Sequence, residues 1–412
     1  MGDTLASRPV TVAGVFISVV GLAADGRLDA AARERVLGAD VVLGSERQLG
    51  LLPPAGPVQE RVLWPRPLRE RLPALLASYA GRRVVALASG DPLVSGIGTT
   101  LISLLGAASV EIIPALSSVA LARARMRWAS ETCEVVRLVD RDAHAVLAHL
   151  APGHRLLVLS ADESTPSVVS RLLTAAGYGA SRLTVLGDLG TPRESRRETA
   201  AASWQGDAPR LHVLAVELQG PLTTGWVPGL PDEAFEHDGQ LTKRDLRASA
   251  LARLLPAPGR LLWDVGAGAG SIGIEWQRAH PRCRAIAIEA DAERAARIRR
   301  NAERLGVPSL EIVTGHAPEA LSGLPAPDAV FIGGGATHPR LLDTCLAALG
   351  PGGRLVVHGV TLETETLLAD RHARLGGELT RLSVERVDAI GSFRGWRPQR
   401  PVVQWAWVRP AD

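Results

Sequence analysis

The sequence LLWDVGAGAGS, residues 261–271, decides the fold of the second half of the chain. An apolar run is followed by glycines at three alternate positions, and a helical pattern begins directly after them. Glycine accepts positive φ and lets the backbone of a turn approach a ligand closely. The stretch therefore predicts a strand, a tight turn and a helix that together form a ligand site. The three glycines are Gly266, Gly268 and Gly270.

A second apolar stretch, residues 284–291, ends in acidic residues. One of them, Glu289, lies about 20 residues beyond Gly268, and at that offset a carboxylate at the tip of the second strand can bind both hydroxyls of a ribose. Strand, glycine turn, helix, strand and terminal acid together indicate a nucleoside-type cofactor.

Two classes of cofactor use such a framework. A dinucleotide places its pyrophosphate on the helix N-terminus and usually requires G-x-G-x-x-G, whereas this chain has G-x-G-x-G. Asp264, two positions before the first glycine, would repel a pyrophosphate but suits the cationic sulfonium and ammonium of S-adenosylmethionine (SAM). We therefore expect SAM rather than a nicotinamide cofactor. A glycine turn that binds nothing is the remaining interpretation.

Composition restricts the class of protein. With 412 residues, of which 46% are hydrophobic and 22% charged, the chain is long enough for two or three globular domains. The net charge of +3 is a mild excess, and Lys243 is the single lysine among many arginines. This bias is typical of a GC-rich genome, so arginine alone does not indicate phosphate binding. Aromatic residues at 4% also argue against a base-stacking surface for nucleic acid.

Cysteines and apolar runs indicate the compartment. Cys133, Cys283 and Cys345 are scattered without C-x-x-C spacing, which favours neither disulfides nor a zinc site, so no metal is expected. Arg8 precedes an apolar run over residues 10–24 that could be read as a signal peptide, but a turn at 23–26 favours a buried first strand. No run reaches the roughly 20 apolar residues of a membrane helix. We expect a soluble, cytoplasmic protein without membrane or nucleic-acid partners.

Two α/β domains are expected. Over residues 14–218 short apolar strands alternate with amphipathic helices, which predicts a largely parallel sheet, and Pro114 is expected to divide the domain into two lobes around a cleft. A Gly-, Pro- and Thr-rich linker, residues 219–228, leads to a second alternation over 229–412. The first domain's strands are expected at 15–20, 41–43, 84–87, 110–113, 156–159, 183–186 and 211–216, and its helices at 28–37, 68–79, 97–105, 118–124, 143–150 and 167–176.

The second domain is expected to form an otherwise parallel seven-stranded sheet. Its final antiparallel pair should lie near residues 382–387 and 402–408. This Rossmann-like arrangement is the usual shape of a class I SAM-dependent methyltransferase.

The most informative segment of the first domain is LASGDPLVSGIG, residues 87–98. A strand ends, Asp91 can cap a turn and Pro92 fixes φ, although a Gly-Asp-Pro loop alone is more often an ordinary connection. With Gly21-Leu22, IIPALSS at 112–118 and LGTPRE at 189–194, the segment resembles the tetrapyrrole methylase family, the two-lobed SAM enzymes of corrin and sirohaem synthesis. The resemblance covers residues 14–218 and implies a SAM site at Ser89, Gly90, Asp91, Val94, Ser117 and Ser118.

Two positions depart from that family's pattern. The first turn is usually Gly-x-Gly-Pro-Gly, whereas residues 21–26 are GLAADG, and Ala115 stands where glycine is usual. Both changes place a Cβ near the expected substrate cleft. These changes should affect how a macrocycle binds in the cleft more than how SAM binds. They leave open the alternative that the first domain has lost its cofactor.

Residues around the glycine turn of the second domain form a further pattern. Thr242 is expected to cap a helix, with Asp245 in the capping-box position, while the compact ammonium of Lys243 could bind a substrate carboxylate. Residues 314–321, TGHAPEAL, and 327–335, PDAVFIGGG, are expected beside the adenine and the transferred methyl. His338, just beyond them, is a general-base candidate by residue type.

These motifs resemble the C15-methylating, decarboxylating precorrin methyltransferases of cobalamin synthesis over residues 229–412. His316 departs from the acidic residue common in that family. The SAM contacts that the resemblance implies are Thr242, Gly266, Gly268, Gly270, Glu289 and Ala317.

The two resemblances in this order imply a bifunctional methyltransferase with two SAM sites and a precorrin substrate. The first domain would methylate C5; the second would methylate C15 and remove the carboxyl of the C12 acetate. No catalytic base is evident, and Lys243 and His338 are candidates by residue type alone. Four arginines could receive the substrate carboxylates, namely Arg244, Arg247, Arg394 and Arg397. The resemblance also implies a homo-oligomer. The alternative is another SAM-dependent methyltransferase, acting on RNA or a small molecule, with a non-catalytic N-terminal domain.

Overall fold

The computed structural model describes residues 14–55 and 58–411. Arg8 and residues 10–13 of the first apolar run lie outside this range. The described chain forms two compact units. One contains the residues up to Arg141, Gly153–Thr174 and Tyr178–Gln219; the other contains Asp142–Pro152, Ala175–Gly177 and the residues from Gly220 onward.

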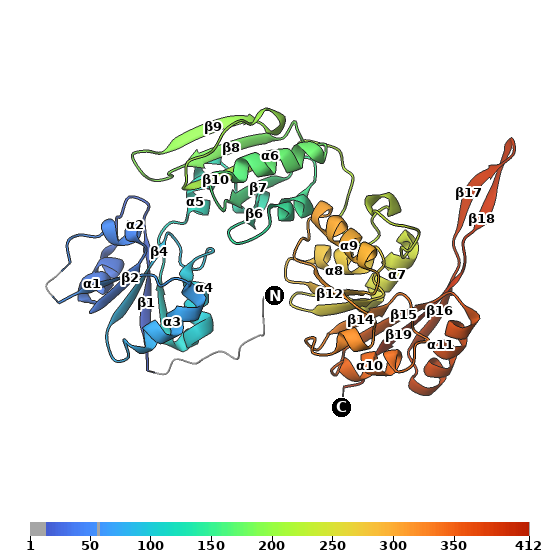
Figure 1. The fold of residues 1–412 in the computed structure, drawn as a ribbon. Helices are drawn as coiled ribbons and strands as arrows, with labels where there is room; N and C mark the ends of the chain where they lie inside the picture. Colours follow the sequence, from blue (N-terminus) through green and yellow to red (C-terminus); the bar gives the residue numbers. More distant parts are fainter. Residues whose placement is uncertain (1–13, 56–57, 412) are drawn as a thin grey trace. The chain divides into compact units, whose positions relative to one another are not determined.

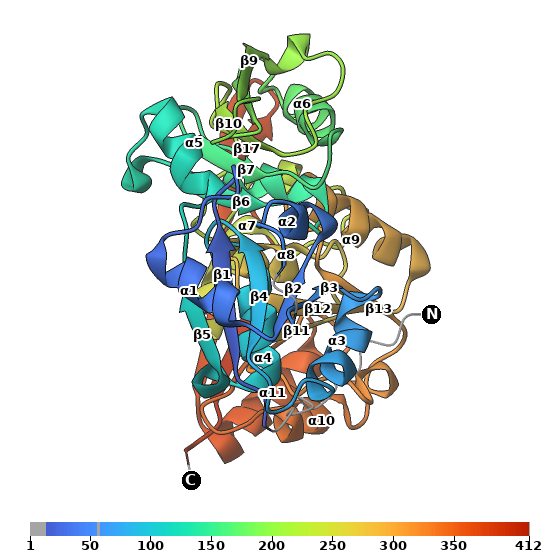
Figure 2. The same cartoon turned by 90° about the vertical axis from the view of Figure 1, so that its left-hand side faces the viewer.

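The first lobe of the first unit is a five-stranded, fully parallel sheet in the order β3-β2-β4-β1-β5. β1 and β4 lie side by side (Figure 2). Successive strand residues point to opposite faces, so α3 and α4 cover one face and α1 and α2 the other. The elements are β1 (Ile17–Leu22), α1 (Ala30–Gly38), β2 (Val41–Gly44), α2 (Glu46–Gly50), β3 (Glu60–Leu63), α3 (Leu68–Ala77), β4 (Val84–Ser89), α4 (Ile97–Leu105) and β5 (Val110–Ile113).

The second lobe has a mixed sheet in the order β6-β7-β10-β8-β9. Only β6 and β7 run parallel, whereas β10 is antiparallel to β7 and β8, and β8 to β9. The expectation of a largely parallel sheet is therefore wrong for this lobe, and the helix expected at 143–150 is a 3₁₀ helix, Ala143–His149. The main elements are α5 (Ser118–Met126), β6 (Glu134–Arg137), β7 (Arg155–Leu159), α6 (Thr165–Ala175), β8 (Arg182–Gly187), β9 (Ser195–Ala200) and β10 (His212–Glu217).

The second unit contains a seven-stranded sheet in the order β13-β12-β11-β14-β15-β19-β16 (Figure 1). The first five strands run parallel, and β19 is antiparallel to both of its neighbours. α7, α8 and α9 pack on one face and α10 and α11 on the other. The elements are α7 (Arg244–Leu254), β11 (Leu261–Val265), α8 (Ser271–Ala279), β12 (Arg284–Glu289), α9 (Ala292–Arg304), β13 (Glu311–Thr314), β14 (Ala329–Ile332), α10 (Leu341–Ala348), β15 (Arg354–Gly359), α11 (Leu362–Leu375), β16 (Glu378–Leu382) and β19 (Val402–Val408).

Between β16 and β19 the chain forms a two-stranded ribbon. β17 (Glu385–Ile390) and β18 (Phe393–Pro398) pair only with each other and extend away from the main sheet (Figure 1). The first strand of the final pair therefore ends at Leu382, before the ribbon, rather than running to residue 387 as expected. The expected two-lobed first domain and Rossmann-like second domain are thus present.

Across residues 14–55 and 58–411, no helix is long and apolar enough to cross a membrane. The same ranges contain no group of three or more His, Cys, Asp or Glu residues that could hold a metal ion.

Candidate functional site

The glycine turn of the second unit connects β11 to α8. All three of its glycines have positive φ, 67° at Gly266, 59° at Gly268 and 76° at Gly270. A Cβ on Gly268 would lie 2.9 Å from the carbonyl oxygen of Gln240, and one on Gly270 would lie 2.7 Å from Cγ2 of Ile298. The turn therefore requires glycine both for its backbone conformation and for the close packing of the segments around it.

Asp264 does not face the ligand side of this turn. Its side chain is buried and Oδ2 accepts a hydrogen bond from the backbone N–H of Gly273 in α8, at 2.9 Å. Oδ1 has no hydrogen-bond partner among the described residues. Burial raises the pKa of Asp264 to about 7. The expectation that this carboxylate lies beside the sulfonium is therefore wrong, because strand alternation directs the side chain to the α8 face of the sheet.

Glu289, at the tip of β12, does lie beside the turn. Its Oε2 accepts from the N–H of Gly268 at 2.7 Å and its Oε1 from the N–H of Asp291 at 3.1 Å. These two bonds fix the carboxylate at the edge of the sheet. Because an ionised carboxylate can accept about four hydrogen bonds, Glu289 keeps acceptor capacity for ligand hydroxyls.

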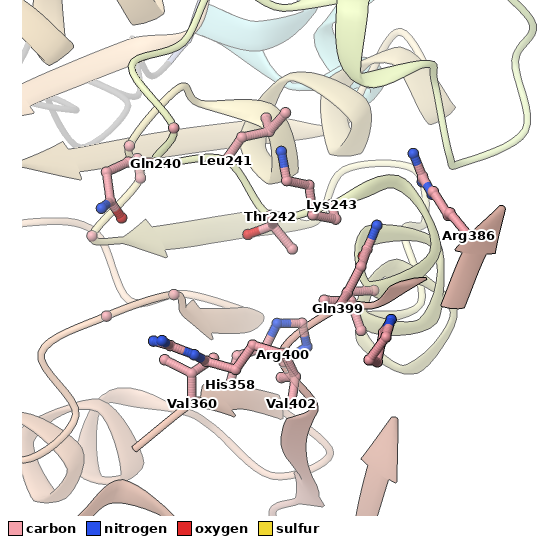
Figure 3. A pocket seen from close by; sticks show the side chains of 18 of the residues that line it. Gln240, Leu241, Thr242, Lys243, His358, Val360, Arg386, Gln399, Arg400 and Val402 are labelled. Atoms are coloured by element: carbon pink, nitrogen blue, oxygen red, sulfur yellow. The ribbon is translucent and has the colours of Figure 1, made fainter. Parts of the chain in front are cut away.

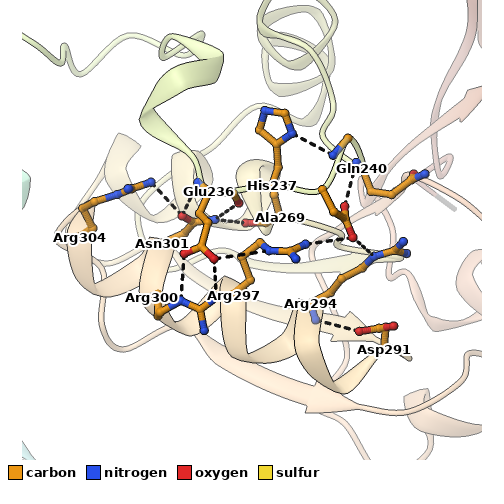
Figure 4. A network of polar contacts seen from close by, with 12 residues as sticks. Glu236, His237, Gln240, Ala269, Asp291, Arg294, Arg297, Arg300, Asn301 and Arg304 are labelled. Carbon is orange, nitrogen blue, oxygen red and sulfur yellow. Dashed lines mark hydrogen bonds and ion pairs between the residues drawn. The ribbon is translucent and has the colours of Figure 1, made fainter.

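A strap, defined here as residues 236–243, crosses above the glycine turn. Ion pairs hold it to α9 (Figure 4): Asp238 contacts Arg294 at 2.9 Å and Arg297 at 3.0 Å, and Glu236 contacts Arg300 at 2.9 Å. Hydrogen bonding by Arg294 holds the pKa of Asp238 far below its usual range. These contacts place the strap over the turn.

A buried ionic cluster anchors the C-terminal end of the strap. Arg247 is fully buried; Nε donates to Glu275 at 2.5 Å, Nη1 to Asp232 at 3.3 Å, and the guanidinium also donates to the carbonyls of Thr242 and Leu230. The expectation that Arg247 receives a substrate carboxylate is wrong, because its donors are satisfied inside the protein.

The start of α7 also differs from the sequence prediction. The capping residue is Lys243, not Thr242, and it makes no side-chain capping bond. Instead Asp232 Oδ1 accepts from the N–H of Arg244 at 2.9 Å. A distant acid thus takes the place of the predicted capping box, and the Thr242 side chain is left facing the pocket (Figure 3).

A pocket of about 1080 Å³ lies over the carboxyl ends of the strands. Ligand pockets are commonly about 300–1,000 Å³, so this one has room for more than a single cofactor. The glycine turn, Glu289 and the strap line it, together with basic residues at the base of the β17–β18 ribbon such as Arg386 (Figure 3). Its lining includes Thr242, Lys243, Gly266, Gly268, Glu289, Arg294, Gly333, Gly334, His358, Val360, Arg386, Asp388, Arg397, Gln399, Arg400 and Val402.

A smaller pocket, of about 260 Å³, lies in the first unit. Ser89 and Gly90, at the end of β4, line it, with Ser118 at the start of α5. The hydroxyl of Ser89 accepts from Arg47 at 2.7 Å and from Gln48 at 3.1 Å. Gly90 has φ 64°, and a Cβ there would lie 2.8 Å from the carbonyl oxygen of Leu116.

Two family models match the chain. "Tetrapyrrole (Corrin/Porphyrin) Methylases" matches residues 19–203 and "Precorrin methyltransferase domain" matches 233–409. A precorrin-6Y C(5,15)-methyltransferase [decarboxylating] from Sinorhizobium sp is 43% identical over 99% of this chain and 100% of its own length. The enzyme of the same name from Mycobacterium tuberculosis (strain CDC 1551 / Oshkosh) is 44% identical over 95% of this chain and 99% of its own length.

The chain belongs to the precorrin-6Y C(5,15)-methyltransferase (decarboxylating) family. It is a methyltransferase, and the alternative of a different SAM enzyme with an accessory N-terminal domain is not favoured. A solved C-terminal domain of a precorrin-6Y C5,15-methyltransferase from Rhodobacter capsulatus is 47% identical, covering 45% of this chain and 100% of that one with a TM-score of 0.43.

The residues predicted from the family resemblance to bind SAM in the C-terminal domain divide into those that line the large pocket and those that do not. Thr242, Gly266, Gly268 and Glu289 line the large pocket together. Gly270 and Ala317 do not line it: Gly270 packs against α9, and Ala317 packs against the core beneath α10 and α11. Of the two base candidates, Lys243 lines the pocket, whereas His338 is exposed outside its lining.

The predicted N-terminal residues divide similarly. Ser89, Gly90 and Ser118 line the smaller pocket, whereas Asp91, Val94 and Ser117 do not. Asp91 accepts from the N–H of Leu93, and Ser117 caps α5 through the N–H of Ala120. Of the two departures from the family pattern, Ala24 in the first turn lines the pocket and Ala115 does not.

Sequence reasoning missed several residues of the large pocket. His358, the penultimate residue of β15, is 8% exposed, and Arg386, Gln399 and Arg400 lie at the base of the ribbon. His358 could have been predicted from the sequence, because ligands bind at the carboxyl ends of the strands in such sheets and this histidine follows an apolar strand. The arginines gave no such signal, because arginine is frequent throughout the chain. Of the arginines predicted to receive substrate carboxylates, Arg397 lines the pocket, whereas Arg244 and Arg394 lie outside its lining.

Proposed function

We propose that the chain methylates a precorrin at C5 and C15, with SAM as the donor, and removes the carboxyl group of the C12 acetate. Residues 14–218 form the C5-methylating domain, residues 219–228 the linker, and residues 229–412 the C15-methylating and decarboxylating domain. The observation that carries the proposal is the large pocket, in which a nucleoside-type end meets a strongly basic end.

The nucleoside-type end suits SAM. Glu289 has free acceptor capacity for the ribose hydroxyls, and the close approach at Gly266 and Gly268 leaves backbone exposed to the ligand. Thr242, held in the strap, closes the site from above. SAM supplies an electrophilic methyl group on a sulfonium. The protein contributes position and exclusion of water, which are the main requirements of a methyl transfer to carbon.

The basic end suits a substrate with several carboxylates. Lys243, Arg386, Arg397 and Arg400 line it, with Asp388 as the acid among them. Arg386 pairs with Asp245 at 3.5 Å and Arg397 with Asp388 at 2.9 Å, both on the exposed surface. Surface ion pairs contribute little stability, so these guanidinium groups can exchange partners for substrate carboxylates at small cost. A neutral substrate would gain nothing from this arrangement.

The second SAM site is proposed at the pocket of the first unit. Ser89, Gly90 and Ser118 line it together with Arg47 and Asp188. The pocket's 260 Å³ is small for a nucleoside cofactor, so binding there requires the residues around it to move apart. We further propose that the enzyme is cytoplasmic and forms a homo-oligomer. Light scattering of the purified chain tests the oligomeric state.

The test is titration calorimetry of SAM into the full chain and two variants. Gly268→Ala removes the C-terminal site through its clash with Gln240, and Gly90→Ala removes the N-terminal site through its clash with Leu116. The wild type should bind two SAM molecules and each variant one. Mass spectrometry of the precorrin product should then show loss of one methylation in each variant. A stoichiometry of one in the wild type, unchanged in Gly90→Ala, contradicts the N-terminal site.

A further inference from the structure

His358 lies where the turns that form the methyl-transfer site converge. β11, β14 and β15 are paired neighbours, and His358 stands one residue beyond the Ile332–Val357 pair, at the level of the glycines that follow β11 and β14. Its ring meets Phe331 edge-on, with centroids 5.0 Å apart. It lines the large pocket although it is 8% exposed. It is thus a buried titratable group at the wall of the site.

A hydrogen-bonded chain fixes the tautomer of His358. Nε2 lies 2.9 Å from Oε1 of Gln404, whose Nε2 donates to the hydroxyl of Ser249 at 3.2 Å. Arg253 also donates to that hydroxyl, at 2.8 Å. Because the amide nitrogen of Gln404 is directed to Ser249, its oxygen accepts from His358. This arrangement favours the tautomer with the proton on Nε2 and with Nδ1 as an acceptor.

The surroundings keep this imidazole neutral. Burial lowers the pKa of His358 to about 4, and Arg253 acts in the same direction. The charged groups that line the same pocket are Lys243, Glu289, Arg294, Arg386, Asp388, Arg397 and Arg400. A free Nδ1 lone pair is thus present at neutral pH, and a substrate carboxylate placed beside the ring would raise its pKa.

The proposed reaction both releases and consumes a proton. When a methyl group replaces hydrogen on C15, the sulfur–methyl bond breaks, a carbon–carbon bond forms and the C15–H proton leaves. When the acetate loses CO2, the electron pair of the broken carbon–carbon bond stays on the CH2 group, which must take up one proton to become methyl. The two steps balance without any external acid, base or oxidant.

We propose that Nδ1 of His358 relays this proton, taking it from C15 and returning it to the carbon left by decarboxylation. The inference rests on the proposed function of the C-terminal domain. The acetate stabilises the imidazolium while it is present, and loss of CO2 removes that stabilisation. The return of the proton is therefore coupled to the departure of the carboxyl group, and Gln404 acts as the positioning residue that keeps Nδ1 as the acceptor.

The test uses His358→Gln in the full chain, with His280→Gln as the matched control on a histidine that follows α8 and lies outside the pocket lining. Glutamine can keep the bond to Gln404 but cannot carry a proton. We expect kcat for CO2 release to fall about 100-fold or more, while the SAM Kd and KM stay within about threefold. The control should match the wild type. A kcat within threefold of wild type in His358→Gln overturns the relay.

Nitrogen-15 NMR of the full chain provides a readout that does not depend on turnover. His358 should show a protonated Nε2 and an unprotonated Nδ1, and Gln404→Met should give mixed tautomers with a kcat lowered about tenfold or more. A protonated Nδ1 in the wild type overturns the relay even if the enzyme is active. Wild-type chain that binds SAM but leaves the precorrin unchanged overturns the proposed function, and the relay with it, whatever the tautomer.

Discussion

Replacing Arg247 with methionine should destabilise the C-terminal domain strongly. Methionine fills a similar volume but removes the guanidinium group, which neutralises Glu275 and also contacts Asp232. The side chain of Glu275 is only 2% exposed. Two backbone N–H groups, of Gly229 and Leu230, remain on Glu275, so the acid keeps hydrogen bonds but loses its counter-charge. Breaking a buried ion pair from one side costs about 3–5 kcal/mol.

For a domain of this size, that loss corresponds to a fall in melting temperature of about 6–20 °C. The assay is thermal unfolding of the full chain, with hydrogen exchange of the peptides over α7 and the strap to locate the change. Arg244→Met, on an exposed neighbour, is the control and should change stability by about 0.5 kcal/mol or less. SAM affinity should also fall in Arg247→Met, because the carbonyl of Thr242 loses its donor. A variant that melts within about 2 °C of wild type but no longer binds precorrin would refute the buried cluster and restore Arg247 as a substrate ligand.

Three further predictions follow from the same domain. Glu289→Gln should raise the SAM Kd about 10-fold or more, because a charged acceptor is lost; calorimetry checks this against Glu293→Gln on the exposed side of α9, which should not change it. Asp238→Asn should raise the SAM Kd by a factor of about 5 at most and reduce its dependence on salt, since the strap is held by exposed ion pairs; a salt dependence equal to that of wild type would count against the strap. Asp264 stays protonated up to about pH 7 in the folded chain but only up to about pH 4 in the unfolded chain. The free energy of unfolding therefore falls as pH rises from about 4 to about 7, by roughly 4 kcal/mol in all. Denaturant unfolding should therefore show Asp264→Asn gaining on the wild type between pH 5 and pH 8, and a constant difference would contradict the raised pKa.

The parts of the site that depend on backbone chemistry could be predicted from the sequence. Gly266 and Gly268 were identifiable because few other residues tolerate positive φ beneath a crossing segment. Glu289 was identifiable because strand length fixes where the tip of β12 falls. These features are local, so the residues that determine them lie close together in the chain.

Features that depend on tertiary pairing were not predictable. Asp264 was assigned to the wrong face because an acid at the end of an apolar run does not itself reveal which side of the sheet it faces. Arg247 meets Glu275 only after α7 and α8 have packed together. Arginine is also the commonest basic residue of this chain, so its presence at position 247 gave no signal of a special role. The antiparallel direction of β10 was likewise missed, since an apolar strand has the same sequence pattern whether its neighbours are parallel or antiparallel. The polar strand β9 was not predicted at all.

The order of strands in the C-terminal sheet has a consequence for biosynthesis. β16 is made before β19, yet β19 occupies the place next to β15 and β16 stands outside it. During translation β16 therefore has no partner on the sheet until the ribbon and then β19 have emerged, whereas the first domain can fold as soon as it is complete. A ribosome that stalls within the ribbon would leave an open edge at β15, and a folding helper that recognises unpaired strands would meet this chain there first.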